Sequence, residues 1–193
     1  MKMLSSKRRG KMPTRQSLEG AALYYLSRYA ASEFSLRRVL ANRLRRAARH
    51  NPLFAKDEDL QKQLQAAIES IVEKHRKTGI LNDASYAELK MSAWRRAGRS
   101  ARAIRQRLGR SGVATDIIDQ TLDREGDSEN ENDAEYRAAL TLARRCKLGP
   151  FRKKAADDGR RHKDLAALAR AGFSLAVARR VLKTQADARD ETA

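Results

Sequence analysis

Arginines are concentrated in the segment AWRRAGRSARAIRQRLGRSG, which covers residues 93 to 112. This segment also contains Trp94 and three glycines, and it contains no carboxylate. The planar guanidinium of arginine forms paired hydrogen bonds with phosphate and carboxylate groups, so the segment predicts recognition of an anionic partner. A flexible basic tail and the solvated face of a helix pair are the alternatives, and residue types alone do not separate them.

Residues that could carry catalysis are scattered. His50, His75 and His162 lie far apart in the sequence, and neither a phosphate-binding glycine loop nor a metalloprotease pattern is present. We therefore predict no catalytic residue, no metal site, no cofactor and no enzymatic activity. A magnesium-dependent nuclease is the alternative, because carboxylates are the ligands that Mg²⁺ prefers. Two acid pairs could serve it: Asp57 with Asp59, and Asp157 with Asp158. Solvated acids in polar loops are the ordinary explanation of such pairs.

The whole chain is strongly basic. Its 193 residues include 42 lysines and arginines against 24 acids, which gives a formal net charge of +18 and an isoelectric point near 10.7. Such a charge attracts phosphate polyanions or an acidic protein surface. With few aromatic residues, we expect weak binding of single- and double-stranded DNA without sequence preference.

The sequence predicts a cytoplasmic protein. No apolar stretch approaches the roughly 18 residues that span a bilayer, and the basic first residues lack the apolar core of a signal peptide. Cys146 is the one cysteine, which fits a reducing compartment. We expect it to pack on a helix, and we expect no membrane partner and a monomeric state.

Hydrophobic periodicity predicts an all-α fold. The three prolines stand at segment edges and strand-like runs of β-branched residues are absent. The clearest helix covers about residues 60 to 78 and ends near Gly79. Its apolar stripe consists of Leu60, Leu64, Ile68, Ile71, Val72 and His75. The preceding segment NPLFAKDEDL reads as a loop, and the acidic run between Asp123 and Glu135 reads as an exposed, flexible junction.

An internal repeat organises the chain. When Ser32, Ser100 and Ser174 are aligned, similar residues recur at the same offsets on both sides. Four residues after each serine stand Leu36, Ile104 and Ala178, and five residues after it stand Arg37, Arg105 and Arg179. Eight residues after it stand Leu40, Leu108 and Leu182. Four residues before each serine stand Arg28, Arg96 and Arg170, and six residues before it stand Leu26, Trp94 and Leu168. Nine residues before it stand Leu23, Met91 and Leu165. The repeat predicts three helical hairpins, each with a serine that caps its second helix.

The hairpins alone are too small to be stable, so each needs a further helix. We expect helices at about 60 to 78, 114 to 124 and 133 to 147 to complete elongated tandem repeats of small three-helix bundles. The apolar repeat positions, Trp94 included, are expected in the cores. The predicted divisions are a disordered basic arm (1–16), three helical repeats (17–78, 79–124 and 135–185), an acidic junction (125–134) and a tail (186–193).

Residues 18 to 183 resemble the RecX family, bacterial regulators of the RecA recombinase. The most similar segment covers residues 79 to 122 and has a glycine, two apolar residues, an acid, an aromatic-alanine step and a basic helix with a glycine turn. These features are Gly79, Ile80, Leu81, Asp83, Tyr86, Ala87, Arg95, Arg96, Gly98, Arg99, Ile104, Leu108, Gly112 and Val113. Asn82 stands where the family has a first acid, and the connection at residues 49 to 60 is longer than the family's.

The resemblance implies a regulator, chiefly an inhibitor, that binds along the RecA–DNA filament. It implies that the protein restrains ATP hydrolysis, strand exchange and RecA-stimulated cleavage of repressors, within DNA repair, recombination and the SOS response. The arginines of the repeated hairpins are the candidate contacts with RecA or DNA: Arg37, Arg38, Arg95, Arg96, Arg99, Arg102, Arg105, Arg179 and Arg180.

A sequence-specific repressor is the alternative function, because the hairpins superficially resemble a helix-turn-helix. The recognition helix would then be the segment VATDIIDQTLD, residues 113 to 123, which carries Asp116, Asp119 and Asp123 and no cation. A recognition helix lies close to phosphates in the major groove, so these acids count against a repressor.

Overall fold

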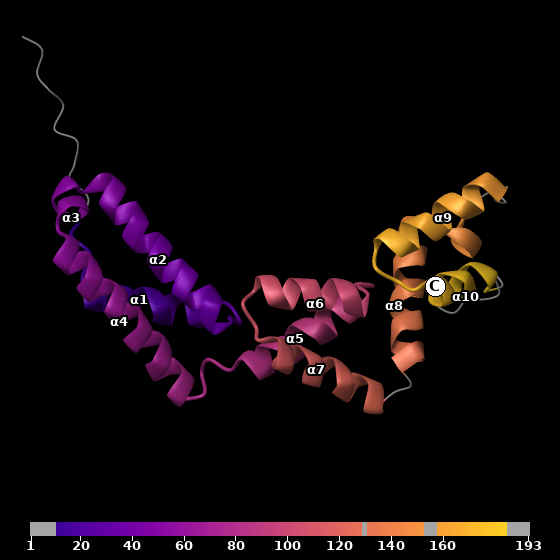
Figure 1. Ribbon diagram of the computed structural model, residues 1–193, viewed down its shortest axis with the longest axis horizontal. Coiled ribbons are helices and arrows are strands. Elements are labelled where there is room, and N and C mark those ends of the chain that lie inside the picture. The colour runs from indigo at the N-terminus through magenta and orange to yellow at the C-terminus, as the bar shows by residue number, and fades with distance from the viewer. Residues whose placement is uncertain (1–10, 129–130, 153–157, 185–193) are drawn as a thin grey trace, which may run out of the picture. The chain divides into compact units, whose positions relative to one another are not determined.

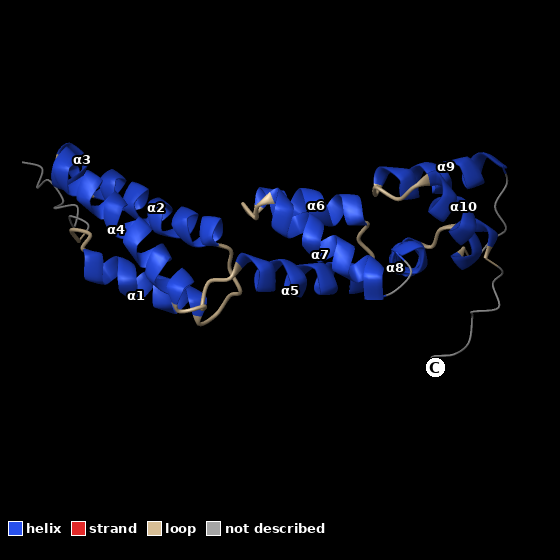
Figure 2. Cartoon of the chain, turned by 60° about the horizontal axis from the view of Figure 1, so that its bottom comes forward, coloured by secondary structure: helices blue, strands red, loops and turns tan. Residues whose placement is uncertain are grey.

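The computed structural model describes residues 11–128, 131–152 and 158–184. These residues form ten α-helices and a short 3-10 helix. No strand is present among the described residues (Figures 1 and 2). The predicted all-α fold class is confirmed. None of the described helices is long and apolar enough to cross a membrane. The chain divides into two compact units, Met1–Tyr86 and Ala87–Ala193. The predicted second repeat (79–124) begins in the first unit and continues in the second, and the predicted third repeat (135–185) falls in the second unit.

Three long helices form the first unit. They are α1 (Arg15–Leu26), α2 (Glu33–His50) and α4 (Glu58–Lys77), which pack against one another (Figure 1). Their core contains Leu18, Ala22, Leu36, Leu40, Leu64, Ile68, Ile71 and Val72. The predicted basic arm lies mainly outside the described residues. Its described end is ordered, because Pro13 is buried and Thr14 forms a capping box with Ser17 at the start of α1.

Helix α4 agrees closely with the prediction. The Asp57 carboxylate accepts a hydrogen bond from the Leu60 amide at 2.9 Å and caps the helix, which is a structural role for this acid. Acids in the first turn and cations in the last turn complement the helix dipole. The predicted stop at Gly79 is confirmed, because this glycine has φ +73° just beyond the helix.

The expected loop between α2 and α4 contains a helix instead. Helix α3 (Pro52–Lys56) begins with proline in its first turn, and the Asn51 side chain caps it by accepting from the amides of Leu53 and Phe54. Phe54 is 1% exposed and belongs to the core of the first unit. Burial of Phe54 holds this segment against the core, and the predicted loop is therefore wrong for residues 52 to 56.

Among the described residues, only His75 has a buried polar side-chain atom without a hydrogen-bond partner, and that atom is Nδ1. The side chain is 6% exposed on α4, as the periodicity predicts. Burial, together with the neighbouring charge of Lys74, lowers the pKa of His75 from its ordinary value of 6.5.

This lowered pKa predicts a loss of stability in mild acid. Since the unfolded chain binds a proton at higher pH than the folded chain, the contribution of neutral His75 is complete above about pH 6.5 and is lost as the pH falls toward the lower folded pKa. Urea unfolding at about pH 7.5 and about pH 5 measures this loss. His75→Leu should lose less stability between the two pH values than the parent, and an equal loss in both proteins would contradict the assignment.

The second unit contains two bundles of three helices. The first is built from α5 (Asp83–Arg96, which begins in the first unit), α6 (Ala101–Arg110) and α7 (Thr115–Ser128). Its buried residues include Ala87, Ile104, Leu108, Val113 and Ile118. The second is built from α8 (Glu131–Cys146), α9 (Asp158–Arg170) and α10 (Leu175–Lys183), with the 3-10 helix η1 (Gly149–Phe151). Its core includes Ala139, Leu142, Leu168, Phe173, Ala178 and Val181.

The predicted capping serines all cap a helix. Ser32, Ser100 and Ser174 precede α2, α6 and α10, and each side chain accepts from the backbone amide three residues later. The residues four positions after them, Leu36, Ile104 and Ala178, are each 0% exposed. The repeat therefore reports a real structural unit.

The first hairpin differs from the others in its turn. Five residues separate α1 from Ser32, whereas three separate α5 from Ser100 and α9 from Ser174. Two extra residues correspond to a rotation of about 200° along a helix, so the alignment fails before the turn. Leu23, expected in the core, is 58% exposed, and Leu26 is partly buried.

Two further residues are less buried than the sequence suggests. Trp94 is half-buried, and the guanidinium of Arg107 lies 5.5 Å from the centre of its ring. Cys146 ends α8 and is exposed, so the expectation that it packs on a helix is wrong.

The acidic run is largely helical. Helix α7 continues to Ser128 and α8 begins at Glu131, so the described residues of the predicted junction are helical, and residues 129 and 130 lie outside the described residues. Glu125 and Glu135, at the two ends of this run, are only 17% and 16% exposed. These acids are partners for the basic segment.

The turn of the second hairpin lies against the last bundle. Gly98 has φ +75°, and a Cβ placed there would stand 2.8 Å from the backbone nitrogen of Leu142 on α8. The Ser100 hydroxyl donates to the carbonyl oxygen of Ala171, in the turn of the third hairpin, at 2.7 Å. The turn of the second hairpin therefore contacts both α8 and the turn of the third hairpin.

Candidate interaction surfaces

Arg95 joins three elements of the second unit and is almost buried. Its side chain is 10% exposed and forms ion pairs with Glu125 of α7, at 2.7 Å, and with Glu135 of α8. It also donates to the carbonyl oxygen of Arg99, and Glu135 accepts from the amide of Ala101 at 3.0 Å. This geometry removes Arg95 from the exposed surface that the sequence predicts.

The ion pairs also raise the pKa of this arginine. Burial by itself lowers the pKa of Arg95, but the hydrogen bonds with Glu125 and Glu135 outweigh burial and hold the pKa above its ordinary value. Because an unpaired charge in this position would be costly, Arg95 is a structural residue that fixes α5, α7 and α8 together.

Three neighbouring arginines of the same segment are free to meet a partner. Arg96 and Arg102 are exposed, and Arg99 is half-buried beside the hairpin turn. Arg96 donates to the Ser92 hydroxyl at 2.9 Å. Arg99 and Arg102 form no ion pair with any described residue. Together they make the turn of the second hairpin strongly positive.

The matching arginine Arg105 is engaged within the bundle. Its guanidinium pairs with Asp119 of α7 at 2.6 Å, and both side chains are about half exposed. Asp119 belongs to the helix that a helix-turn-helix reading would place in the major groove. Since Asp116 and Asp123 of the same helix are also exposed, that helix presents carboxylates outward.

The first hairpin places its two predicted arginines differently. Arg37 is bound to Glu33 at 3.1 Å and to Glu69 of α4 at 2.8 Å, so it links α2 to α4. Burial lowers the pKa of Arg37, and the hydrogen bonds with Glu69 and Glu33 more than reverse that effect. Arg38 is exposed, with its guanidinium 5.7 Å from the centre of the Phe34 ring.

The third hairpin exposes both of its predicted arginines. Arg180 pairs with Asp133 at 3.3 Å and lies 4.0 Å from the centre of the Tyr136 ring. Arg179 forms no ion pair with a described residue and lines a hollow of about 830 Å³ together with Lys183. The structure therefore leaves Arg38 of the first hairpin, Arg96 and Arg102 of the second and Arg179 and Arg180 of the third exposed, and it engages Arg37, Arg95 and Arg105 in ion pairs within their bundles.

Sequence analysis missed two groups of exposed residues. Arg43, Arg46 and Arg49 extend along α2 beyond the repeat offsets, and all three are exposed. These arginines lie in the run RLRRAARH, outside the offsets at which residues recur among the three hairpins. Exposed aromatic rings also gather on the first hairpin, where Tyr24, Tyr29 and Phe34 are 60%, 58% and 44% exposed.

No group of three or more potential metal ligands occurs within the described part of the chain. Asp57 of the first suggested acid pair is committed to capping α4. Asp157 lies outside the described residues, as does the side chain of Asp158.

Comparison with known proteins decides the family. No family model matches the chain. The chain is 40% identical over 166 residues to the Regulatory protein RecX of Myxococcus xanthus (strain DK1622), with 86% of this chain and 83% of that protein covered. The chain belongs to the RecX family. It is also 33% identical to the Regulatory protein RecX of Agrobacterium fabrum (strain C58 / ATCC 33970) over 102 residues, which cover 53% of this chain and 51% of that protein.

Solved RecX structures share the fold. A crystal structure titled regulatory protein RecX matches with a TM-score of 0.64 at 20% identity, covering 88% of this chain and 72% of that one. The crystal structure of RecX from Lactobacillus salivarius matches with a TM-score of 0.59 at 18% identity, covering 88% and 94%. The chain is therefore a regulatory protein of the RecX family with that family's helical architecture.

Proposed function

We propose that this RecX-family protein regulates RecA, chiefly as an inhibitor, by binding along the RecA–DNA filament. In this proposal it restrains ATP hydrolysis, strand exchange and the stimulation of repressor cleavage, and it acts as a monomer in the cytoplasm. The observation that carries the proposal is the similarity to RecX over 86% of the chain. The net charge of +18 supports it, since a filament on DNA presents phosphates and acidic protein groups.

The contacts are proposed at the predicted arginines that the bundles leave exposed, and at Arg99, which is half-buried at the hairpin turn. Arg99 and Arg102 at the second hairpin are the main pair, and Arg38, Arg96, Arg179 and Arg180 contribute from the same and the other hairpins. Each exposed contact is worth about 1 kcal/mol or less, but linked contacts along a repeating filament add to a useful affinity. Arg37, Arg95 and Arg105 mainly hold their own bundles and are secondary.

Charge reversal at the main pair tests this proposal. The double variant Arg99→Glu, Arg102→Glu should lose inhibition of the DNA-dependent ATPase of RecA by about tenfold or more, which corresponds to at least about 1.4 kcal/mol of binding. Its helicity and melting temperature should stay close to the parent's, because neither side chain forms an ion pair with a described residue.

The matched control is Lys56→Glu, Lys62→Glu, which makes the same change in net charge at exposed positions of the first unit. It should inhibit nearly as well as the parent. If Arg99→Glu, Arg102→Glu inhibits RecA as well as the parent does, the second hairpin is only a solvated face and the contacts lie elsewhere.

The protein alone should bind single- and double-stranded DNA weakly and without sequence preference. If about five phosphates are neutralised, the logarithm of affinity should fall with the logarithm of salt concentration with a slope of roughly −4. Fluorescence anisotropy over a range of salt concentrations measures the slope. A salt-independent affinity would contradict the phosphate contacts, and a sharp footprint on one operator would favour the repressor alternative.

A further inference from the structure

A groove between α1 and α2 in the first unit has a volume of about 760 Å³. Residues spaced three and four apart on each helix line it, so one stripe of α1 faces one stripe of α2. The lining from α1 is Ser17, Gly20, Ala21, Tyr24 and Tyr25, and the lining from α2 is Val39, Asn42, Arg43 and Arg46. None of these lining residues carries a carboxylate, and the two charged ones, Arg43 and Arg46 on α2, are positive.

Gly20 lies on the α1 side of the groove and has no side chain to fill it. It stands in the middle of a helix, is exposed, and a Cβ placed there would have no atom within 4 Å. Glycine in a helix interior is destabilising relative to alanine, and packing within this chain does not require it. The missing side chain leaves space for a ligand between the two helices.

The two groove arginines are not used inside the protein. Arg43 and Arg46 are exposed on α2 and form no ion pair with any described residue. They stand one helical turn apart along the same wall, which suits successive charges of an extended polyanion.

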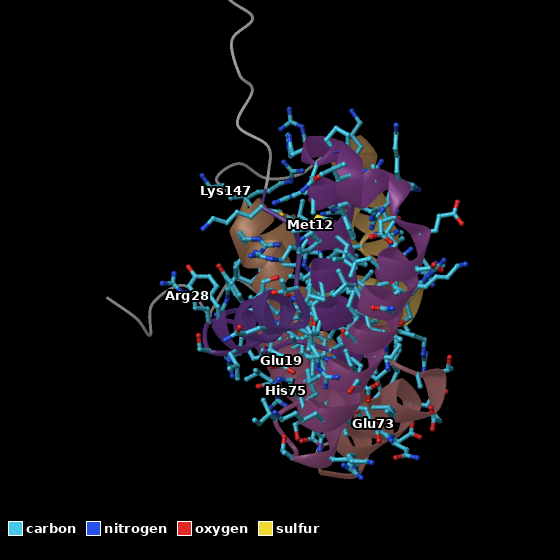
Figure 3. All side chains as sticks on the ribbon, turned by 90° about the vertical axis from the view of Figure 1, so that its left-hand side faces the viewer. Met12, Glu19, Arg28, Glu73, His75 and Lys147 are labelled. Carbon is cyan, nitrogen blue, oxygen red and sulfur yellow. The ribbon has the colours of Figure 1, made fainter. Side chains whose placement is uncertain are left out.

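Aromatic rings lie at the end of the groove nearest the hairpin turn. Tyr24 is 60% exposed, and the guanidinium of Arg28 lies 4.6 Å from the centre of its ring. Arg28 extends away from α1 and α2 (Figure 3). Tyr29, 58% exposed, pairs with Tyr25 at 5.3 Å between ring centres.

These two features favour one class of ligand. An acidic peptide would use the arginines but would not need exposed rings, and a DNA duplex hides the faces of its bases. Exposed rings beside a cationic groove are how proteins hold single strands, with bases stacked on the rings and phosphates on the cations.

We propose that this groove binds single-stranded nucleic acid, with a base stacked on Tyr24 and the adjoining phosphates bound by Arg43 and Arg46. The site adds a place for a strand to the proposed regulation of RecA. Its test contains no RecA, so it can fail while the inhibition proposal stands, and the reverse also holds.

Binding of the full chain to three fluorescent probes tests the site: oligothymidylate, an abasic deoxyribose phosphate strand of the same length, and a duplex. Tyr24→Ala should weaken binding of oligothymidylate by about tenfold and leave binding of the abasic strand unchanged, because only bases stack. Tyr24→Phe should restore oligothymidylate binding, since the ring is sufficient. Arg43→Ala, Arg46→Ala should weaken binding of both strands and make the salt dependence less steep.

Two controls have similar exposure but lie outside the groove. Leu23→Ala, next to Tyr24, and Arg49→Ala, on the same helix as the groove arginines, should each bind oligothymidylate within about twofold of the parent. Circular dichroism checks that every variant remains helical. Equal losses for the oligothymidylate and abasic strands in Tyr24→Ala, no loss at all, or losses in the controls as large as in the groove variants would overturn the proposal.

Discussion

Replacing Arg95 with alanine is expected to lower the free energy of unfolding of the second unit by about 3 to 5 kcal/mol. The arginine is 10% exposed and neutralises Glu125 and Glu135, which are themselves 17% and 16% exposed. Its removal leaves two carboxylates without their shared counter-charge where water cannot easily replace it. Urea unfolding followed by circular dichroism measures the change.

Arg105→Ala is the matched control for this variant. It removes an arginine from the same basic segment and breaks one ion pair between helices, but the side chain is 53% exposed. Its cost should be about 1 kcal/mol or less. Equal losses in Arg95→Ala and Arg105→Ala would mean that the two glutamates are well solvated and that Arg95 does not hold the helices together.

The second large effect is expected for Gly98→Ala, which should cost about 2 to 5 kcal/mol. The added Cβ would meet backbone atoms of α8 at 2.8 Å and 3.0 Å, and it would be held at a φ of +75° that alanine rarely adopts. Backbone atoms within a helix cannot move aside as a flexible side chain can, so the turn and α8 must separate.

Gly79→Ala isolates the contribution of the close contact. Gly79 has nearly the same φ, +73°, but a Cβ there would have no atom within 4 Å. The free energy of unfolding of Gly79→Ala should therefore fall by only about 1 to 2 kcal/mol, which is the cost of holding alanine at a positive φ. Thermal unfolding of both variants gives the comparison. A loss in Gly98→Ala no greater than in Gly79→Ala would show that α8 does not press on this turn.

Local patterns allowed most of the helices to be predicted. Apolar spacing located α4, and alignment on Ser32, Ser100 and Ser174 located the capped second helix of each hairpin. Each of these patterns is local, because the residues that form it lie close together along the chain. Helix α3 escaped prediction because a five-residue helix has almost no periodicity, and its stability comes from the burial of Phe54 among distant residues.

The candidate site was less predictable, because the exposure of an arginine depends on residues far along the chain. Arg95 and Arg102 are equivalent by residue type and by their basic surroundings. What separates them is Glu135, forty residues after Arg95, and the acidic run gave no signal of its pairing partner. The groove on the first hairpin was missed for the opposite reason. Its arginines and tyrosines were visible in the sequence, but their meeting depends on how α1 packs on α2.

The three serine caps differ in which natural substitutions they can accept. Ser174 is exposed and its oxygen accepts from Val177, so aspartate or asparagine, which are equally good caps, could replace it. Ser100 is buried, and its hydroxyl must both accept from Ala103 and donate to Ala171. A carboxylate cannot donate when ionised and would add a buried charge, and an asparagine amide is larger and divides its donor and acceptor between two atoms, whereas a hydroxyl does both from one atom. Among relatives, we expect position 100 to vary between serine and threonine at most, while position 174 drifts among all the good caps.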